Sequence, residues 1–247
     1  MGTHAINVYD FVNRAGSSAG YACFTREIGV SYARQTLITA TYDIWKWFEQ
    51  YSAAQRKDVN RLVLILENFP DSQVQVPANA TTNEIHLNGR YIASYSGDVK
   101  REITGVLYHE VTHVLQRNGN GQAPGWLIEG IADYARLRSC YIPSNWVKPG
   151  GGDSFYKGYD VTARFLDYCT GLRSNFVAEL IKKLRPTGYV DDYFRQLIEK
   201  GVSDTRSGSN VEVVNVDCMN ANDGNRQGYH ANKEREIKKR GAMDYCV

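Results

Sequence analysis

A five-residue segment, His109-Glu110-Val111-Thr112-His113, constrains the fold of this chain more than any other feature. A helix repeats every ~3.6 residues, so two histidines four positions apart project from one face and can bind the same metal ion. Glu110 follows the first histidine directly, where it can take a proton from a metal-bound water. The segment therefore predicts a helix that carries two metal ligands and a general base.

A second segment, from Trp126 to Asp133, supplies the donor that the first lacks. A catalytic zinc ion takes three protein ligands and leaves one position for water, so two histidines need one further ligand. We expect this ligand to be Glu129, while Asp133, one helical turn farther on, holds the other ring nitrogen of one histidine. The reverse assignment, with Asp133 as the ligand and Glu129 outside it, stays open.

These donors predict a hydrolase that uses Zn2+ to activate a water molecule. Zinc would polarise the water and the scissile carbonyl, and Glu110 would remove the water's proton and return it to the leaving amine. The developing oxyanion needs a second donor, for which we choose Tyr159 over Tyr134 and Tyr108. A metzincin would carry a third histidine where this chain has Gly119, so the site is of the two-histidine, one-glutamate type, as in gluzincins.

The remaining pattern predicts an α+β fold with a small mixed sheet and a mainly helical C-terminal half. Apolar residues that step by three and four predict one long helix from Thr25 to about Tyr51. A buried strand is expected at residues 61–67, and a half-exposed one at 83–88 that forms the sheet edge where an extended peptide binds. Further helices are expected from Asp98 to Arg117, Pro124 to Arg138, Asp160 (as N-cap) to Thr170, Asn175 to Leu184 and Asp191 to Lys200.

Length and composition limit the other possibilities. A chain of 247 residues, 43% hydrophobic, can bury its own core, and we expect one catalytic domain at residues 1–204 with a poorly ordered polar tail at 205–247. The formal charge of +2 is too small to indicate a nucleic-acid partner, and without an apolar run of ~18 residues no membrane span is expected. The five cysteines are too sparse for a disulfide scaffold, although a Cys140 to Cys169 bridge stays open.

Long segments around these motifs resemble the plant basic secretory protein family, whose members are regarded as zinc peptidases. The matching segments are His109 to Leu137, Tyr95 to Tyr108 and Gly158 to Cys169, with shorter ones at Glu27 to Gly29 and Gln35 to Leu37. The resemblance covers about Ile6 to Asp204, and from Thr205 the chain continues into an unrelated tail. It implies a zincin-like fold, zinc on the two histidines and Glu129 with Glu110 as base, and secretion to the apoplast, although the N-terminus lacks the pattern of a secretory signal.

Two functions from different classes follow. The leading hypothesis is a zinc-dependent peptidase, acting as a monomer on peptide or protein substrates in plant defence or stress response. The alternative is a defence-related binding protein that retains zinc but has little or no turnover. A hydrolase of non-peptide substrates would require the same residues, so the sequence does not separate it from the first hypothesis.

Overall fold

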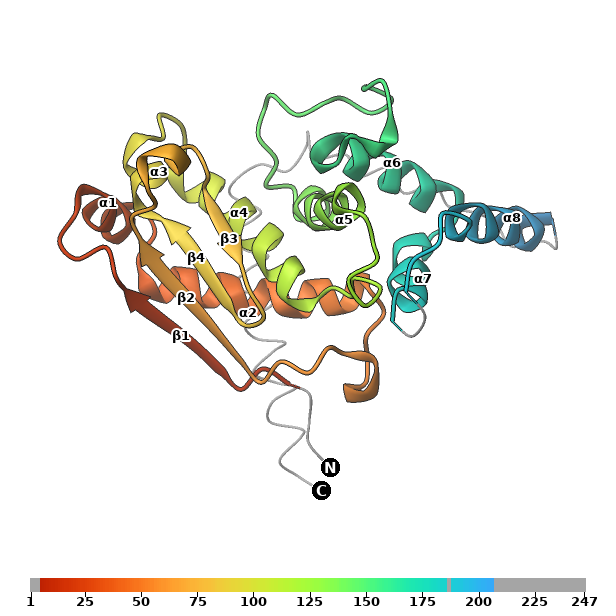
Figure 1. Cartoon of the computed structure of the whole chain (residues 1–247), viewed down its shortest axis with the longest axis horizontal. Coiled ribbons are helices and arrows are strands. Elements are labelled where there is room, and N and C mark those ends of the chain that lie inside the picture. Colours follow the sequence, from red (N-terminus) through yellow and green to blue (C-terminus); the bar gives the residue numbers. More distant parts are fainter. Residues whose placement is uncertain (1–4, 186–187, 207–247) are drawn as a thin grey trace. The chain divides into compact units, whose positions relative to one another are not determined.

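The computed structural model describes residues 5–185 and 188–206. They form an α+β fold in which a four-stranded mixed sheet packs against helices, in the strand order β1-β2-β4-β3 (Figure 1). The strands are β1 (Val8–Asn13), β2 (Arg61–Glu67), β3 (Ala78–Ala80) and β4 (Glu84–Asn88). β1, β2 and β4 are parallel, and β3 runs antiparallel to β4. The predicted α+β class with a small mixed sheet is confirmed.

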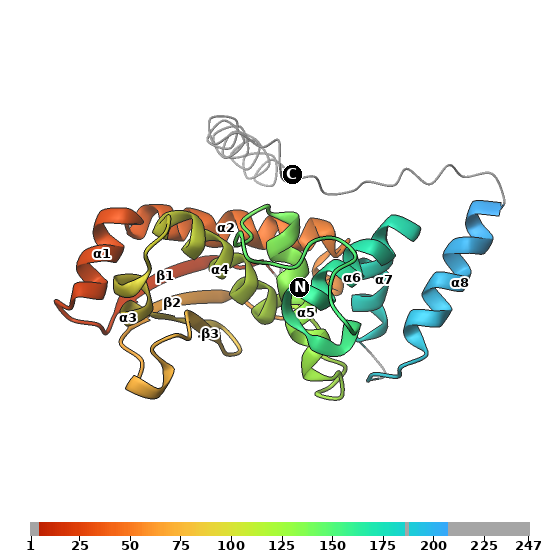
Figure 2. The same cartoon turned by 90° about the horizontal axis from the view of Figure 1, so that it is seen from above.

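Helices cover one face of this sheet and make up most of the chain after it. In Figure 2, α2 and α4 lie along the same side of the strands. The helices are α1 (Ala19–Glu27), α2 (Val30–Trp47), α3 (Gly89–Ser94), α4 (Val99–Leu115), α5 (Gly125–Arg138), α6 (Tyr159–Leu172), α7 (Phe176–Lys183) and α8 (Tyr193–Arg206), with short 3-10 turns η1 (Ala53–Gln55), η2 (Asp71–Gln73) and η3 (Phe155–Lys157). Within the described part of the chain, none of them is long and apolar enough to cross a bilayer.

The core forms where the central strands meet the helical layer. Leu64 of β2 pairs in register with Ile85 of β4, and Leu66 pairs with Leu87. Successive side chains of a strand point to opposite faces, so these residues share the face that packs against α2 and α4. All four are buried, and the sheet thereby fixes the position of the helix that carries the two histidines.

The single helix predicted from Thr25 to Tyr51 is wrong, because the chain breaks between α1 and α2. Gly29 has a φ of 75°, a conformation that glycine adopts without the steric penalty of other residues. Its N–H donates to the carbonyl of Phe24 at 2.8 Å, which closes the end of α1. The spacing of Ile28 and Tyr32 continues the apolar pattern across this break, so periodicity alone did not reveal it.

The strand predicted at residues 83–88 is present as β4, but its predicted position at the edge of the sheet is wrong. β4 lies between β2 and β3, and the edge on this side of the sheet is the three-residue strand β3. β3 begins just after Pro77, and it is too short to show the alternation by which a strand is predicted. The prediction for the tail at 205–247 cannot be compared, because α8 continues to Arg206 and residues 207–247 lie outside the described residues.

Among the described cysteines, Cys23 and Cys169 are free thiols, whereas Cys140 is in a disulfide. A Cys140 to Cys169 bridge is therefore not formed. Cys169 is fully buried on α6, and this burial raises the pKa of its thiol to about 12. It behaves as a small hydrophobic side chain.

Gly130 allows α5 and α6 to approach closely. A Cβ atom at position 130 would lie 2.2 Å from Cγ2 of Thr162. The buried Thr162 hydroxyl donates to the Phe155 carbonyl at 2.5 Å and accepts from the Gly158 N–H at 2.9 Å, which fixes the rotamer. Because neither side can yield, the close packing of these helices requires glycine.

Replacement of Gly130 by alanine is expected to lower the free energy of unfolding by about 1–3 kcal/mol, as overpacking of a core does. This cost exceeds the gain in helix propensity of about 1 kcal/mol. Gly125→Ala is the matched control in the same helix, because a Cβ there meets nothing within 4 Å, and we expect it to be neutral or stabilising. Urea unfolding of both variants tests this, and equal effects would contradict the packing argument.

Candidate metal centre

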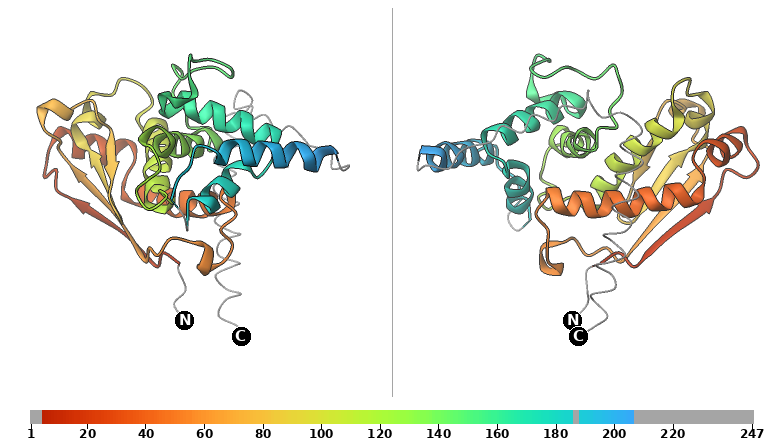
Figure 3. Two further views of the ribbon diagram at one scale, coloured as in Figure 1. Left: turned by 45° about the vertical axis from the view of Figure 1, so that its right-hand side comes forward. Right: turned by 180° about the vertical axis from the view of Figure 1, so that it is seen from behind.

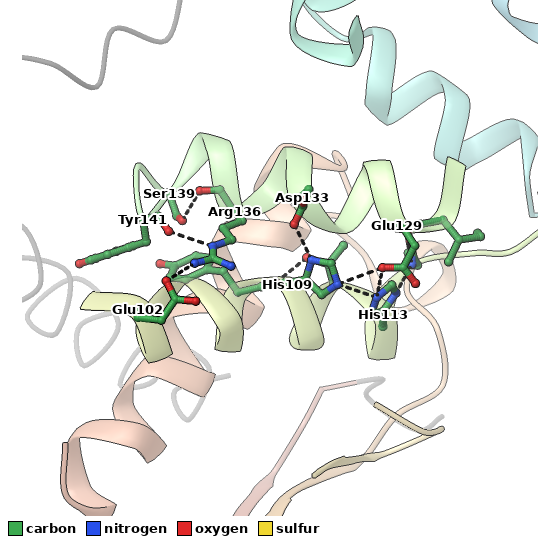
Figure 4. A network of polar contacts seen from close by, with 12 residues as sticks. Glu102, His109, His113, Glu129, Asp133, Arg136, Ser139 and Tyr141 are labelled. Atoms are coloured by element: carbon green, nitrogen blue, oxygen red, sulfur yellow. Dashed lines mark hydrogen bonds and ion pairs between the residues drawn. The ribbon is translucent and has the colours of Figure 1, made fainter. Parts of the chain in front are cut away.

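The candidate metal centre is built on two neighbouring helices, α4 and α5. Asp98 caps the start of α4 by accepting the Arg101 N–H at 2.8 Å, as the sequence predicted. α4 contributes His109, Glu110 and His113, and α5 contributes Glu129 and Asp133 from the facing surface. Figure 4 shows the histidines of one helix and the carboxylates of the other converging between them.

Three side chains bring one ligand atom each to the same point. His109 Nε2 and His113 Nε2 lie 2.9 Å apart, and Glu129 Oε2 lies 3.2 Å from the first and 3.4 Å from the second. The three side chains are 13, 17 and 30% exposed, so the cluster is accessible from one side. Two imidazole nitrogens and one carboxylate oxygen are the donor set of many catalytic zinc sites.

The spacing of these atoms fits a single metal ion. For zinc–nitrogen distances of ~2.0–2.1 Å and tetrahedral angles, neighbouring ligand atoms lie about 3.3 Å apart, close to the separations among His109, His113 and Glu129. The cluster also favours positive charge. Burial opposes protonation of His109, but hydrogen bonds to Asp133 and Glu129 outweigh it and raise the histidine's pKa to about 10. The three residues could therefore hold a metal ion.

Outer partners orient both histidines. Asp133 Oδ1 lies 2.6 Å from His109 Nδ1, and the amide of Gln116 lies 2.8 Å from His113 Nδ1. Asp133 accepts from the Nδ1–H of His109, which leaves the lone pair of His109 Nε2 free for a metal ion, and the contact with the Gln116 amide nitrogen holds the ring of His113 with Nε2 toward the cluster. The sequence analysis identified Asp133 but missed Gln116, although its position three residues after His113 on the same helix was a usable signal.

Glu110 lies beside the cluster, and its carboxyl group is not fully hydrogen-bonded within the described residues. Its side chain is buried, and Oε2 has no hydrogen-bond partner among the described residues. Burial raises the pKa of Glu110, against the opposing effect of His109 and His113. A buried carboxyl group that the protein does not otherwise use is available to exchange a proton with a bound molecule.

Of the three tyrosines considered from the sequence, Tyr159 alone lines the cavity at this site. Its ring lies parallel to that of His109, with centroids 6.4 Å apart and an interplanar angle of 7°. The hydroxyl groups of the other two are engaged elsewhere, Tyr108 with Asp43 at 2.8 Å and Tyr134 with Thr170 at 3.2 Å. The structure thus brings Tyr159 to the cluster and places the alternatives away from it.

The helix after this site starts two residues earlier than predicted. Gly158, not Asp160, is the N-cap of α6. Tyr159 is the first residue of the helix, and its φ is positive, at 47°. Non-glycine residues adopt this conformation at a cost, and they are frequent at functional sites. Asp160 instead accepts the Val147 N–H at 2.8 Å and so fastens the preceding loop.

The cluster opens into a cavity of about 840 Å3, within the ~300–1,000 Å3 of small-molecule sites. α4 forms its floor, α5 and the start of α6 form one wall, and residues 75–80, which include the edge strand β3, form the other. The cavity lies beside a sheet edge, and His109, His113 and Glu129 all line it.

A buried ion pair joins α4 to α5 beyond Asp133. Arg136 Nη2 lies 2.7 Å from Glu102 Oε2, and its Nε donates to the Tyr141 carbonyl at 2.9 Å (Figure 4). Gly105 allows this approach, because a Cβ there would lie 2.6 Å from Arg136 Nε. The sequence analysis missed this pair, since its members lie on different helices and no local spacing relates them.

Comparison with known proteins agrees with this description. A family model described as "BSP: Peptidase of plants and bacteria" matches residues 6–206. The chain belongs to this family. The match confirms the resemblance to basic secretory proteins over nearly the same residues as predicted. No curated protein and no solved structure is significantly similar to the chain.

Proposed function

We propose that the chain is a zinc-dependent peptidase that cleaves peptide bonds, with a role in plant defence or stress response. The observation that carries this proposal is the convergence of His109, His113 and Glu129 beside the buried Glu110, whose Oε2 has no partner among the described residues. Membership of a family of peptidases supports the reaction type. We further propose that the protein acts as a monomer in the apoplast, as the family resemblance implies.

His109, His113 and Glu129 would hold the metal, with Asp133 and Gln116 orienting the two histidines. A bound zinc ion supplies Lewis acidity, which polarises a carbonyl group and makes water more acidic. Glu110 acts as the general base toward the attacking water and then as the general acid toward the leaving amine. Its raised pKa suits both roles, because a group that must take and return a proton works best when its pKa is near the working pH.

Tyr159 is the proposed donor to the oxygen that becomes negatively charged as the carbonyl is attacked. Its ring packs beside His109 and it lines the cavity into which a substrate would bind. Burial, followed by Glu129, Asp133 and Glu110, raises the pKa of this hydroxyl. The group therefore keeps its proton and can donate a hydrogen bond.

The sheet edge gives the cavity a means of binding an extended chain. β3 pairs with β4 on one side and lies at the edge of the sheet, and its residues line the same cavity as His109, His113 and Glu129. An extended peptide can add to such an edge through backbone hydrogen bonds, which favour peptides of many sequences. We infer a zincin-like arrangement, with an edge strand beside the metal helix and the peptide substrate between the strand and α5.

Metal analysis combined with a peptide-library digest tests this function. We expect about one zinc per chain, cleavage of the library, loss of cleavage with a chelator, and recovery when zinc is added back. Stoichiometric zinc without any cleavage would rule out the peptidase and leave the zinc-retaining binding protein. Cleavage that survives complete removal of the metal would instead rule out the proposed role of the cluster.

A further inference from the structure

A second cavity, away from the candidate metal centre, is lined by residues at the end of α2, in η1 and in α7. The right-hand view of Figure 3 shows the ribbons of these elements near one another. Its volume is about 120 Å3, well below the ~300–1,000 Å3 of sites for drug-sized ligands. Gln50 and Gln55 lie on one wall, Ala178 and Ile181 of α7 on another, and Arg117 enters just after the end of α4. The space therefore suits a small ion or chemical group, and not a peptide.

The charges around this cavity do not balance. Arg117, Lys182 and Arg185 line it against Glu49 and Glu179. Glu179 is already engaged, because its Oε1 lies 3.4 Å from the Lys182 ammonium. Within residues 5–185 and 188–206, neither Arg117 nor Arg185 forms an ion pair with a carboxylate. With Glu49 set against the two arginines, the lining keeps an excess of one positive charge.

The guanidinium group of Arg117 is only partly hydrogen-bonded. Its Nη2 donates to the Arg56 carbonyl at 2.7 Å, but its Nε is buried and has no partner in the described part of the chain. Burial, and next the charge of Arg185, lower the pKa of Arg117. Burial, and next Arg117, likewise lower the pKa of Lys57. Partly buried cations that repel one another require a counter-charge.

Helix ends explain only part of this arrangement. Arg117 follows the C-terminus of α4 and Arg185 that of α7, where free carbonyl groups attract cations. This attraction acts on each arginine separately, so it does not remove the repulsion between them.

We propose that this cavity binds a small oxyanion, namely a free phosphate ion or the phosphate group of a small ester, between Arg117 and Arg185. The planar guanidinium group donates to two oxygens of such an anion at once. One bound anion would attract both arginines, replace their repulsion, and join the end of α4 to α7. Gln116, which contacts His113, directly precedes Arg117, so the anion would stabilise the end of the metal helix.

Thermal unfolding of the full chain as purified, at increasing phosphate and constant ionic strength, tests the site. Phosphate and sulfate stabilise most proteins by being excluded from their surfaces, so the informative quantity is the difference between variants. We expect a saturable rise in the Tm of the wild type that is absent in Arg185→Gln. Arg185 is exposed, so this variant should fold. Arg26→Gln, an exposed residue of α1 paired with Glu27, is the matched control and should behave as the wild type.

Calorimetric titration with inorganic phosphate and with O-phosphoserine measures the affinity directly. Loss of charge-assisted hydrogen bonds should weaken phosphate binding by about tenfold or more in Arg185→Gln and in Arg117→Gln. Binding of both probes would support a site open to phosphate esters, and binding of inorganic phosphate alone would support a site for the free ion. Equal phosphate-dependent Tm shifts in the wild type, Arg185→Gln and Arg117→Gln would overturn the proposal. The absence of calorimetric binding by the wild type would overturn it as well.

Discussion

Replacement of Glu110 by glutamine is expected to reduce kcat for peptide hydrolysis by about 100- to 10,000-fold, the range that a positioned general base contributes. Glutamine keeps the shape of the side chain but cannot accept the proton of the attacking water. The metal should remain bound at wild-type stoichiometry, because Glu110 is not among the three residues whose ligand atoms converge. Steady-state kinetics on a cleaved library peptide, together with metal analysis of the same samples, measures both results.

Stability provides the second readout for this variant. The Glu110 carboxyl group is buried, with one oxygen unpartnered within the described residues, so a neutral amide should leave the Tm unchanged or raise it. Glu27→Gln is the matched control, since Glu27 lies on α1 and its contact is an exposed pair with Arg26. If Glu110→Gln retained full activity, or lost the metal, the assignment of Glu110 as the base would be wrong.

Local patterns in the sequence predicted much of the site. The two histidines of α4 are separated by one helical turn, and so are Glu129 and Asp133 of α5, so their shared faces follow from helix geometry alone. The bounds of α5 were predicted directly, because proline precedes the helix and its apolar residues recur regularly. The position of Gln116 follows from helix geometry in the same way, because it lies three residues after His113. The sequence prediction for the partners of the histidines included only residues of the second helix.

The features that were missed depend on contacts between distant segments. The Arg136–Glu102 pair joins residues on different helices, and β3 becomes a strand because it pairs with β4. Gly29 and Gly130 show the same limit. One ends a helix by its positive φ and the other admits Thr162, yet an isolated glycine in a sequence does not reveal which role it has. Contacts between distant segments determine these features, and the periodicity of apolar residues in the sequence does not show such contacts.

Removal of the Glu129 carboxylate is expected to weaken zinc binding far more than removal of the Asp133 charge. Glu129 Oε2 lies 3.2 and 3.4 Å from the Nε2 atoms of the two histidines, whereas Asp133 contacts the opposite ring nitrogen of His109. Asp133→Asn should therefore weaken zinc binding by about 10- to 100-fold, as the loss of an outer partner does. Glu129→Ala should exceed this range, because it removes one of three ligands.

Competition with a chromophoric zinc chelator measures the zinc affinities of the wild type, Asp133→Asn and Glu129→Ala under the same conditions. Glu84→Gln, on β4, is the matched control for a carboxylate that contacts a histidine outside the site, because Glu84 lies 3.3 Å from His86, and it should bind zinc as the wild type does. If Asp133→Asn lost zinc while Glu129→Ala retained it, the third ligand would be Asp133, the alternative that the spacing of the two carboxylates left open. The distances make that outcome unexpected, because reaching both Nε2 atoms would require Asp133 to abandon the His109 Nδ1 contact that orients the ring.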